Sequence, residues 1–400
     1  MFAYYIQELL RRDHSVSFIA LADAHEQHLV SDLAGQVDHF QVVPRSRRLF
    51  ARAGRLLRWA IDPAEYALVH SSRLHAALSK VLQRGQRFDV IHAVHPWLIR
   101  AAWSAVQRLP GPARPALVGH IMDISAVLRL QRVYAAPRHV RLFYLLDFAR
   151  VTFRELSDYS LADGLIAHNS RDIEVLNLLS PRPVHVCLSP VWFDAINRIV
   201  DKYRKRESDI ILLVGNFYDF RTTEGATWFI NEVIPLILSA VDKKIRLDLI
   251  SMNNPKLRNM FCNKEYIECY TYKDLDEFIA LYDLASVFVF PLRQGRYSRH
   301  IKVLNAFARG LPVVMTSWAN SGAEAVPGEE ALIADTPEAF AECIIRLLRD
   351  PALAARIAEG GLRRIRREYP SPSVVLDSLE QAYQTAITQK EYRRRGTSWL

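Results

Sequence analysis

Basic side chains gather in the segment FPLRQGRYSRHIKVLNAFARG (290–310), directly after the apolar run SVFVF (286–290). Arg296 and Arg299 lie in a glycine-containing loop, and Lys302 lies in the first turn of the helix that the apolar spacing predicts next. A helix N-terminus carries partial positive charge and free N–H groups, so cations beside it favour a diphosphate. We therefore predict that these three residues bind the diphosphate of a nucleotide-linked substrate. The alternative is a solvated run of charge.

The surrounding elements must form a βαβ unit of a parallel sheet if this site is to exist. The order is a buried strand, the basic loop, the helix IKVLNAFARG and the buried strand LPVVMTS (311–317). Such a loop lies at the carboxyl edge of its sheet, where open α/β sheets bind ligands. Ser321 and Gly322 follow in a second predicted loop that approaches the sugar or phosphate. An ordinary surface turn is the alternative for this pair.

The same segment resembles the donor-binding half of family 4 glycosyltransferases, which are retaining enzymes of the two-domain GT-B fold. The matching positions are Pro291, Leu292, Gly295, Lys302, Val303, Leu304, Ala306, Ala308, Gly310, Pro312, Val313 and Val314. The similarity continues through residues 331–361 and is weaker over nearly the whole chain. The resemblance implies an α/β protein with two doubly wound Rossmann-like domains and a cleft between them. It also implies retaining transfer of a sugar from a nucleotide-diphosphate donor to a glycan or lipid-linked acceptor, in polysaccharide or glycoconjugate synthesis.

The sequence departs from this family at two carboxylates. The glutamate that grips the ribose falls at Asn305, and the other glutamate of the paired motif falls at Tyr297. A carboxylate accepts charge-assisted hydrogen bonds from both ribose hydroxyls, whereas Asn offers one acceptor and one donor group. Asn305 either holds a ribose more weakly, or changes the donor choice, or is a plain surface residue. The alternative to an enzyme is therefore a non-catalytic GT-B-like binding or scaffold protein with a degenerate donor site.

A glycine turn earlier in the chain completes the predicted donor site. In VGNFYDFRTTEGATWF (214–229), Gly215 follows a buried strand and precedes a predicted helix. The resemblance implies that this loop faces the donor phosphates and places Arg221 near them. The alternative is a strand-to-helix turn that needs glycine for a positive φ.

Alternating β-rich and helical runs predict two domains. We expect an acceptor-side domain over 1–193, a linker over 194–208, a nucleotide-sugar-binding domain over 209–371, and a crossing helix with a basic tail over 372–400. The chain starts with the helical pattern FAYYIQELLRRDH (2–14). In the resembled family a strand and a glycine-rich turn precede this helix, so we expect them to be missing through truncation or a misplaced start. A natural variant that begins with the helix is the alternative.

Two polar residues follow buried strands in the first half. His95 comes after FDVIHAV (88–94) and Asp123 comes after ALVGHI (116–121). Related enzymes use polar residues of such loops to orient the acceptor or the leaving sugar, so these two are the catalytic candidates. The alternative for His95, and for His92 within the first strand, is a core or loop histidine.

The 400 residues carry 52 Lys and Arg against 43 Asp and Glu, a net charge of +9. This excess favours acidic partners. The segment PRSRRLFARAGRLLRWAI (44–61) reads as a basic amphipathic helix suited to an anionic membrane surface, and the tail KEYRRRGTSWL (390–400) adds a weaker signal. The alternative is a solvated helix packed on the sheet. No nucleic-acid reader module accompanies the charge, so we expect no nucleic-acid partner.

Four cysteines (Cys187, Cys262, Cys269 and Cys343) are scattered without metal-ligand spacing. We therefore expect free thiols, no metal site and no cofactor, with the nucleotide-sugar as co-substrate. No apolar run reaches the roughly 18–20 residues that cross a bilayer, and the N-terminus lacks a signal pattern. We expect a cytoplasmic protein, peripheral on the inner face of the membrane.

Overall fold

The computed structural model describes residues 2–22, 33–44, 72–83, 87–122, 124–168, 170–188, 209–217, 219–242, 244–251, 256–261, 263–270, 275–294, 300–371 and 373–394. Several predicted positions lie outside the described residues, namely Asp123, Gly295, Arg296, Tyr297, Arg299, almost all of 44–61, and 395–400. The chain divides into two compact units. The first is Met1–Pro190 with Ser373–Leu400, and the second is Val191–Pro372.

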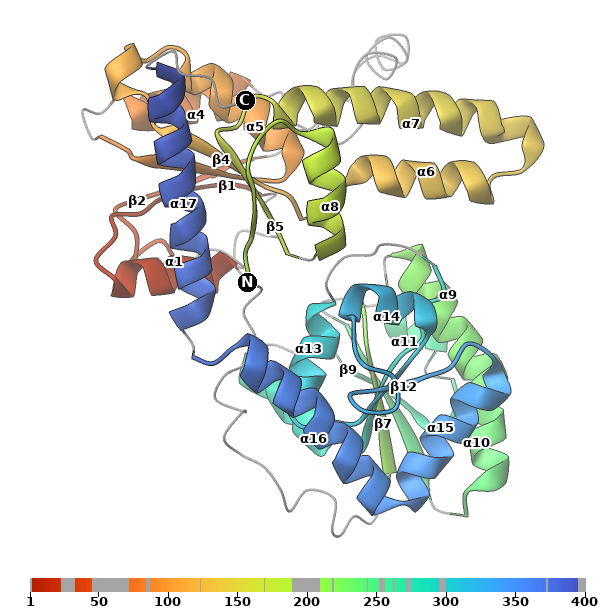
Figure 1. The fold of residues 1–400 in the computed structure, drawn as a ribbon. Helices are drawn as coiled ribbons and strands as arrows, with labels where there is room; N and C mark the ends of the chain where they lie inside the picture. Colours follow the sequence, from red (N-terminus) through yellow and green to blue (C-terminus); the bar gives the residue numbers. More distant parts are fainter. Residues whose placement is uncertain are drawn as a thin grey trace. The chain divides into compact units, whose positions relative to one another are not determined.

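The described strands of the first unit form two separate parallel sheets (Figure 1). One pairs β1 (Ser17–Leu21) with β2 (His39–Val43). The other has the order β3-β4-β5-β6, with β3 (Val90–Val94), β4 (Ala116–His120), β5 (Gly164–Ala167) and β6 (Val184–Val186). The predicted buried strands at 88–94 and 116–121 correspond to β3 and β4. The absence of a strand before residue 2 stays a prediction.

The helices of this unit are α1 (Phe2–Arg11), α4 (Ser72–Leu82), α5 (Pro96–Val106), α6 (Ser125–Ala135), α7 (Arg138–Tyr159), α8 (Ser170–Leu179) and α17 (Ser373–Arg394), with a 3-10 turn at Gly111–Ala113. Three of them, α5, α8 and α17, pack on its four-stranded sheet, and the others pack elsewhere in the unit. α5 packs on β3 and β4, and α17 returns from the far end of the chain to pack on β4 and β5. Ile99, Leu117 and Leu165 are fully or almost fully buried between these layers. Arg393, one of the tail arginines, pairs with Asp163 at 3.1 Å and so anchors α17.

The second unit is one parallel sheet with the order β12-β11-β10-β7-β8-β9. Its strands are β7 (Asp209–Val214), β8 (Ile245–Ile250), β9 (Ile267–Tyr270), β10 (Val287–Phe290), β11 (Val313–Met315) and β12 (Leu332–Ile333). The uninterrupted apolar runs of β7 and β10 are buried along their whole length. Parallel strands covered by helices on both faces have this character.

The helices of the second unit lie on the two faces of that sheet (Figure 1). They are α9 (Phe220–Trp228), α10 (Ile234–Ala240), α11 (Lys256–Phe261), α12 (Leu275–Leu284), α13 (Ile301–Ala308), α14 (Ser317–Ala323), α15 (Pro337–Arg349) and α16 (Pro351–Glu368). A π-helical turn, Phe229–Val233, joins α9 to α10. Among the helices that the structure describes, none is long and apolar enough to cross a membrane.

Candidate functional site

The second sheet reverses its winding between β7 and β10. β7 is the first strand of its unit and lies in the middle of the sheet, with β8 and β9 on one side and β10, β11 and β12 on the other. Open α/β sheets bind their ligands at the carboxyl ends of the strands beside such a switch point. The loops that leave β7 and β10 lead into α9 and α13, and these two helices carry Arg221 and Lys302.

Gly215 and Asp219 shape the turn from β7 into α9. A Cβ on Gly215 would lie 2.2 Å from Cγ2 of Thr222, so the loop can meet the helix only at a glycine. The φ of Gly215 is not positive, so the alternative that a left-handed turn requires this glycine is wrong. Asp219 caps α9, because its carboxylate accepts a hydrogen bond from the backbone N–H of Arg221 at 3.2 Å.

The end of α13 is fixed by a Schellman motif. Gly310 has a φ of 60°, and its N–H and that of the next residue donate to the carbonyls of Phe307 and Ala306, each at 2.9 Å. The motif explains why glycine and then Leu-Pro follow this helix. Lys302 lies in the first turn of α13 and Asn305 near its middle, and residues three apart on a helix share a face.

The ammonium of Lys302 forms no ion pair in the part of the chain that the structure describes, although the Asp219 carboxylate is near enough to act on its charge. Burial lowers the pKa of Lys302, the Asp219 carboxylate opposes this shift, and the Arg221 guanidinium adds to it. Lys302 is half-buried and has lost part of its hydration, and the one carboxylate near it already pairs with Arg221. A bound anion would supply the missing interaction.

Arg221 is already engaged within α9. Its Nε donates to Oδ1 of Asp219 at 2.8 Å, and its Nη2 donates to Oδ2. This bidentate pair uses two of the five N–H groups of the guanidinium. The remaining donors can reach a phosphate, while the charge of Arg221 contributes to the positive field around Lys302.

His300 precedes α13 and is a site residue that the sequence patterns do not single out. Its ring tilts against that of Phe290, with the centroids 4.8 Å apart, and its buried Nε2 finds no hydrogen-bond partner among the described residues. Burial, with the charges of Lys302 and Arg221, lowers the pKa of His300 to about 3. The imidazole is therefore neutral near pH 7 and can give or accept one hydrogen bond. In the sequence, the feature that could have identified His300 as a site residue is its position directly before the predicted helix.

Asn305 is a buried residue, so the alternative of a plain surface asparagine is wrong. It is 6% exposed, and its Oδ1 has no hydrogen-bond partner within the described structure. Buried amide oxygens are nearly always paired, so an unpaired one calls for an explanation. A ligand hydroxyl donating to Oδ1 would satisfy it. Asn305 thus presents an acceptor one helical turn beyond the Lys302 cation.

Ser321 and Gly322 lie in α14, so the prediction that they occupy a loop is wrong. The hydroxyl of Ser321 donates to the carbonyl of Trp318 at 2.6 Å, within the helix, and Gly322 is buried. α14 begins after Thr316, whose side chain accepts from the N–H of Ala319. A threonine cap followed by small residues was the missed helix signal.

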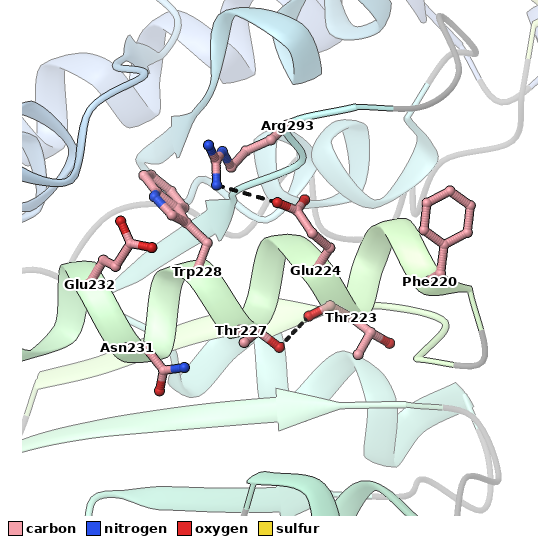
Figure 2. A pocket seen from close by; sticks show the side chains of 8 residues that line it. All are labelled: Phe220, Thr223, Glu224, Thr227, Trp228, Asn231, Glu232 and Arg293. Carbon is pink, nitrogen blue, oxygen red and sulfur yellow. Dashed lines mark hydrogen bonds and ion pairs between the residues drawn. The ribbon is translucent and has the colours of Figure 1, made fainter. Parts of the chain in front are cut away.

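A groove of about 440 Å³ runs along α9 and ends against the segment that leaves β10 (Figure 2). Its lining residues are Phe220, Thr223, Glu224, Thr227, Trp228, Asn231, Glu232 and Arg293. The Arg293 guanidinium lies over the Trp228 ring, 5.1 Å from its centroid, and Nη1 donates to Oε1 of Glu224 at 3.3 Å. Arg293 thereby fastens the exit of β10 to α9. The spacing of Glu224 and Trp228 by one turn was the only sequence signal for this contact.

His95 is held in a backbone conformation that side chains rarely adopt. Its φ is 78° and its ψ is 146°, and its N–H donates to the carbonyl of His120 at 2.8 Å. The His95 ring stacks on Trp97 with the centroids 4.3 Å apart. Such strain concentrates at functional positions. The structure therefore places His95 at the start of α5, beyond the carboxyl end of β3.

Three histidines in the first unit, of which His120 and His168 are buried and His92 is half-buried, form a hydrogen-bonded chain. His92 Nε2 lies 2.8 Å from His120 Nδ1, and His120 Nε2 lies 2.7 Å from His168 Nε2. At one end, His168 Nδ1 lies 2.8 Å from the carbonyl of Cys187; at the other, His92 Nδ1 lies 2.7 Å from the Tyr383 hydroxyl. The alternative of a core histidine therefore holds for His92.

The carbonyl at one end fixes every proton in this chain. A carbonyl only accepts, so His168 Nδ1 donates to it and His168 Nε2 accepts from His120. His120 Nδ1 then accepts from His92 Nε2, and His92 Nδ1 accepts from the hydroxyl of Tyr383. Each ring is neutral in this arrangement. Burial, with the nearby His168, lowers the pKa of His92 to about 4.

Cys262 lies outside the described residues, and of the other three cysteines one differs from the prediction. Cys187 and Cys343 are free, as expected, whereas Cys269 is disulfide-bonded. The prediction of free thiols throughout is therefore wrong for Cys269. Burial raises the pKa of the Cys187 thiol, which lies near the Tyr5 hydroxyl, so it stays protonated near pH 7.

Comparison with known proteins bears on the second unit most directly. Residues 208–350 match the family described as Glycosyl transferases group 1. The capsular polysaccharide biosynthesis glycosyltransferase CapM of Staphylococcus aureus is 24% identical over 205 residues, which are 49% of this chain and 51% of that protein. The chain spans about half the length of the curated relatives it matches. The matched family range includes β7, β10 and α13, and with them the switch-point site.

Solved structures match almost the whole chain in fold. HepE from Anabaena, in complex with UDP and glucose, has a TM-score of 0.62 at 11% identity, covering 96% of this chain and 94% of that one. WaaG, a glycosyltransferase involved in lipopolysaccharide biosynthesis, has a TM-score of 0.61 at 14% identity, covering 95% and 94%. The chain has the GT-B fold. The predicted fold class of two Rossmann-like α/β domains is confirmed, and at these identities the GT-B likeness concerns the fold alone.

Proposed function

We propose that this protein is a glycosyltransferase that moves a sugar from a nucleotide-diphosphate donor to a glycan or lipid-linked acceptor with retention. The observation that carries the proposal is the unpaired Lys302 cation beside the unpaired Asn305 oxygen at the switch point of a GT-B unit. The Glycosyl transferases group 1 match over this unit supports it. The names of CapM and WaaG favour a role in polysaccharide or glycoconjugate synthesis.

In the proposed donor site, residues of two helices, α13 and α9, contact the nucleotide-sugar. Lys302 at the start of α13 takes the diphosphate, with its helix N-terminus and a remaining N–H of Arg221 adding to the attraction. Asn305, one turn further, accepts a hydrogen bond from a ribose hydroxyl. Gly215 keeps the loop after β7 free of a side chain, so that backbone can approach the phosphates. HepE, which has the same fold, was solved with UDP and glucose, and this supports a nucleotide-sugar as the donor.

The proposed chemistry needs positioning and charge stabilisation from the protein. The bond between the anomeric carbon and the diphosphate oxygen breaks, and its electron pair leaves with the diphosphate. Lys302 and the neighbouring guanidinium stabilise the charge that develops there. An acceptor hydroxyl then forms the new bond on the same face of the sugar, and its proton passes to the oxygen of the departing diphosphate. We assign His95 and Asp123 to orienting the acceptor or the leaving sugar, and we assign no residue to a metal.

Binding of nucleotides to the purified protein tests this function. Isothermal titration with nucleoside diphosphates and sugar nucleotides should show binding of one of them to the parent protein. Lys302→Ala should abolish it, because the substitution removes the cation nearest the start of α13. Lys244→Ala is the matched control, since that lysine is exposed at the amino end of β8 in the same unit. Equal binding by the parent and Lys302→Ala would exclude the donor site described here.

Asn305 gives a specific reason to keep a second function in view. The resembled family has a glutamate at this position, so a GT-B-like binding or scaffold protein with a weakened donor site is the alternative. The alternative expects no nucleotide binding by the parent protein and no gain when a carboxylate is restored. A transfer assay with the nucleotide-sugar that binds best separates an active enzyme from a protein that only binds.

A further inference from the structure

α6 and α7 form an antiparallel helical hairpin that extends away from the four-stranded sheet of its unit (Figure 1). The two helices pack closely along their lengths, and α7 also packs on α5 near the sheet. Beyond that root, the described part of the unit places no other element against the outer side of α7. The hairpin therefore presents a long helical surface of its own.

Toward the middle of the hairpin, three charged side chains lie between the helices and pair with one another. Asp147 on α7 lies 2.9 Å from Nε of Arg129 on α6, and it accepts a hydrogen bond from Nη2 of Arg150 at 2.5 Å. Glu155 of α7 accepts from the backbone N–H of Ser125 at 2.7 Å and so caps α6. Its burial raises its pKa. The carboxylates of Asp147 and Glu155 are thus both paired within the hairpin.

Apolar side chains of α7 turn outward instead. Leu142 is 67% exposed, Leu146 is 61% exposed and Phe153 is 77% exposed, and their spacing places them on one stripe. Phe143 and Leu145 are also exposed and widen this stripe to an arc of roughly 160° at 3.6 residues per turn. From Leu142 to Phe153 the stripe is about 16 Å long at 1.5 Å per residue. We call these five residues the outer face.

The outer face of α7 departs from the usual pattern of a surface helix in water. Surface helices of globular proteins bury their apolar stripe and expose their charges. An exposed contiguous apolar patch marks a contact with a membrane or a protein. Helices in an apolar surrounding turn their ionisable groups toward one another, as Asp147, Arg129 and Arg150 do here.

Charge at the end of the hairpin indicates which partner fits. Arg132, Arg138 and Arg141 are exposed around the turn between α6 and α7, and the sequence has no Asp or Glu from residue 125 to residue 146. Tyr134, 76% exposed, lies among them. Arginines beside exposed apolar and aromatic residues match the phosphates and acyl boundary of an anionic bilayer. If two copies of the chain met through their outer faces, the arginines of one would lie near those of the other, because the outer face has no carboxylate to pair with them.

We propose that the outer face of the α6–α7 hairpin docks in the interfacial region of an anionic lipid bilayer, with Arg132, Arg138 and Arg141 on the lipid phosphates. The segments 44–61 and 395–400, which the sequence analysis associated with membranes, lie outside the described residues, so this surface is a separate one. The docking requires no donor and no transfer. A failure of vesicle binding therefore leaves the proposed transferase untouched, and the reverse also holds.

Co-sedimentation of the full chain with vesicles of phosphatidylcholine and 30% phosphatidylglycerol tests the docking. The parent should bind these vesicles, and it should bind pure phosphatidylcholine at least tenfold more weakly. Leu142→Asp with Leu146→Asp should reduce binding at least tenfold, because charge replaces the inserted side chains. Arg138→Glu with Arg141→Glu should reduce it equally and remove its dependence on salt. Leu284→Asp, an exposed leucine at the end of α12, is the control that should bind like the parent.

Each outcome decides for or against the proposal. Thermal unfolding of the variants should match that of the parent, since all four substituted positions are exposed, and a matching transition shows that lost binding is not lost folding. Binding that survives both double substitutions, or a parent that does not bind at low salt, would overturn the docking. A parent that is dimeric in solution, does not bind vesicles and becomes monomeric with Leu142→Asp and Leu146→Asp would assign the outer face to a second copy instead.

Discussion

Asn305 and Lys302 share one face of α13, so the choice between an enzyme and a weakened donor site depends on a single side chain. Asn305→Glu should tighten nucleotide binding by about 1–2 kcal/mol, because a carboxylate accepts charge-assisted bonds from ribose hydroxyls. The introduced charge would lie one turn from the Lys302 ammonium, which forms no ion pair among the described residues. Isothermal titration measures the change. Asn305→Gln introduces a side chain as long as that of glutamate but without charge, so it should not tighten nucleotide binding. An equal gain in affinity from both variants would contradict this account.

His95 should show a conflict between stability and activity. Glycine adopts the positive φ of this position without strain, and such strain costs on the order of 1–3 kcal/mol. His95→Gly should therefore raise the free energy of unfolding by about 1 kcal/mol, after the loss of the Trp97 stack, while reducing sugar transfer. Denaturant unfolding and a transfer assay measure the two effects. Asp13→Gly, at a φ of 60° that aspartate tolerates better, should gain less stability and leave transfer unchanged.

α9 lies directly against the exit of β10, and Gly225 is the residue that permits this approach. A Cβ there would lie 2.3 Å from the carbonyl oxygen of Pro291. Gly225→Ala should improve helix propensity by about 1 kcal/mol, yet we expect a net loss of about 1–3 kcal/mol from the clash. The displaced helix should also weaken nucleotide binding. Gly111→Ala, where nothing lies within 4 Å of the added Cβ, is the control. A stabilised Gly225→Ala with normal binding would show that the contact is dispensable.

Elements with strong apolar patterns were predictable from the sequence, and weakly patterned ones were not. The apolar runs at β7 and β10 signalled strands buried on both faces, and the order of strand, loop, helix and strand around α13 signalled the sheet edge. β6 has three residues and α14 has seven, so neither gives a full period of its pattern. α7 exposes the apolar residues of its outer face and pairs charged residues with α6. The usual rule, in which the apolar face of a helix is the buried one, therefore does not describe it.

Site residues that lie in one segment could be predicted from the sequence. Contacts between segments far apart in the sequence could not. Lys302 and Asn305 came from a single helix and its neighbours in sequence. The low pKa of His300 depends in part on the charge of Arg221, which lies 79 residues earlier in the sequence. The chain from His92 through His120 to His168 joins three strands and an additional helix, and no local pattern encodes it.

Acid should weaken the first unit through this chain of neutral histidines. The pKa of His92 is about 4 in the folded protein and about 6.5 when unfolded, so the unfolded chain binds more protons between these values. Stability is thus fully present above about pH 6.5 and is lost as the pH falls toward 4, by about 3 kcal/mol for His92 alone. Hydrogen exchange of the amides of β3 to β5 measures this loss without interference from the second unit.

Two variants check that the histidine chain causes the acid sensitivity. His92→Gln cannot take up a proton, so its stability should change less between pH 6.5 and pH 4 than that of the parent. His139→Gln, at an exposed position of α7, should follow the parent. A parent protein whose β3 to β5 amides stay equally protected from pH 7 to pH 4 would contradict the proposed neutral chain.

The return of α17 to the first unit also sets an order of events during synthesis. The second unit is one continuous stretch, whereas the first needs Ser373–Arg394 to cover β4 and β5 and to bring Tyr383 to His92. A ribosome that adds about 5–20 residues per second takes roughly 10–40 s to pass from residue 190 to residue 394. During that interval one face of the sheet in the first unit is uncovered, because α17 has not been synthesised. The second unit can fold in the same period. The apolar surface left open on β4 and β5 is the part of the nascent chain that chaperones would have to protect.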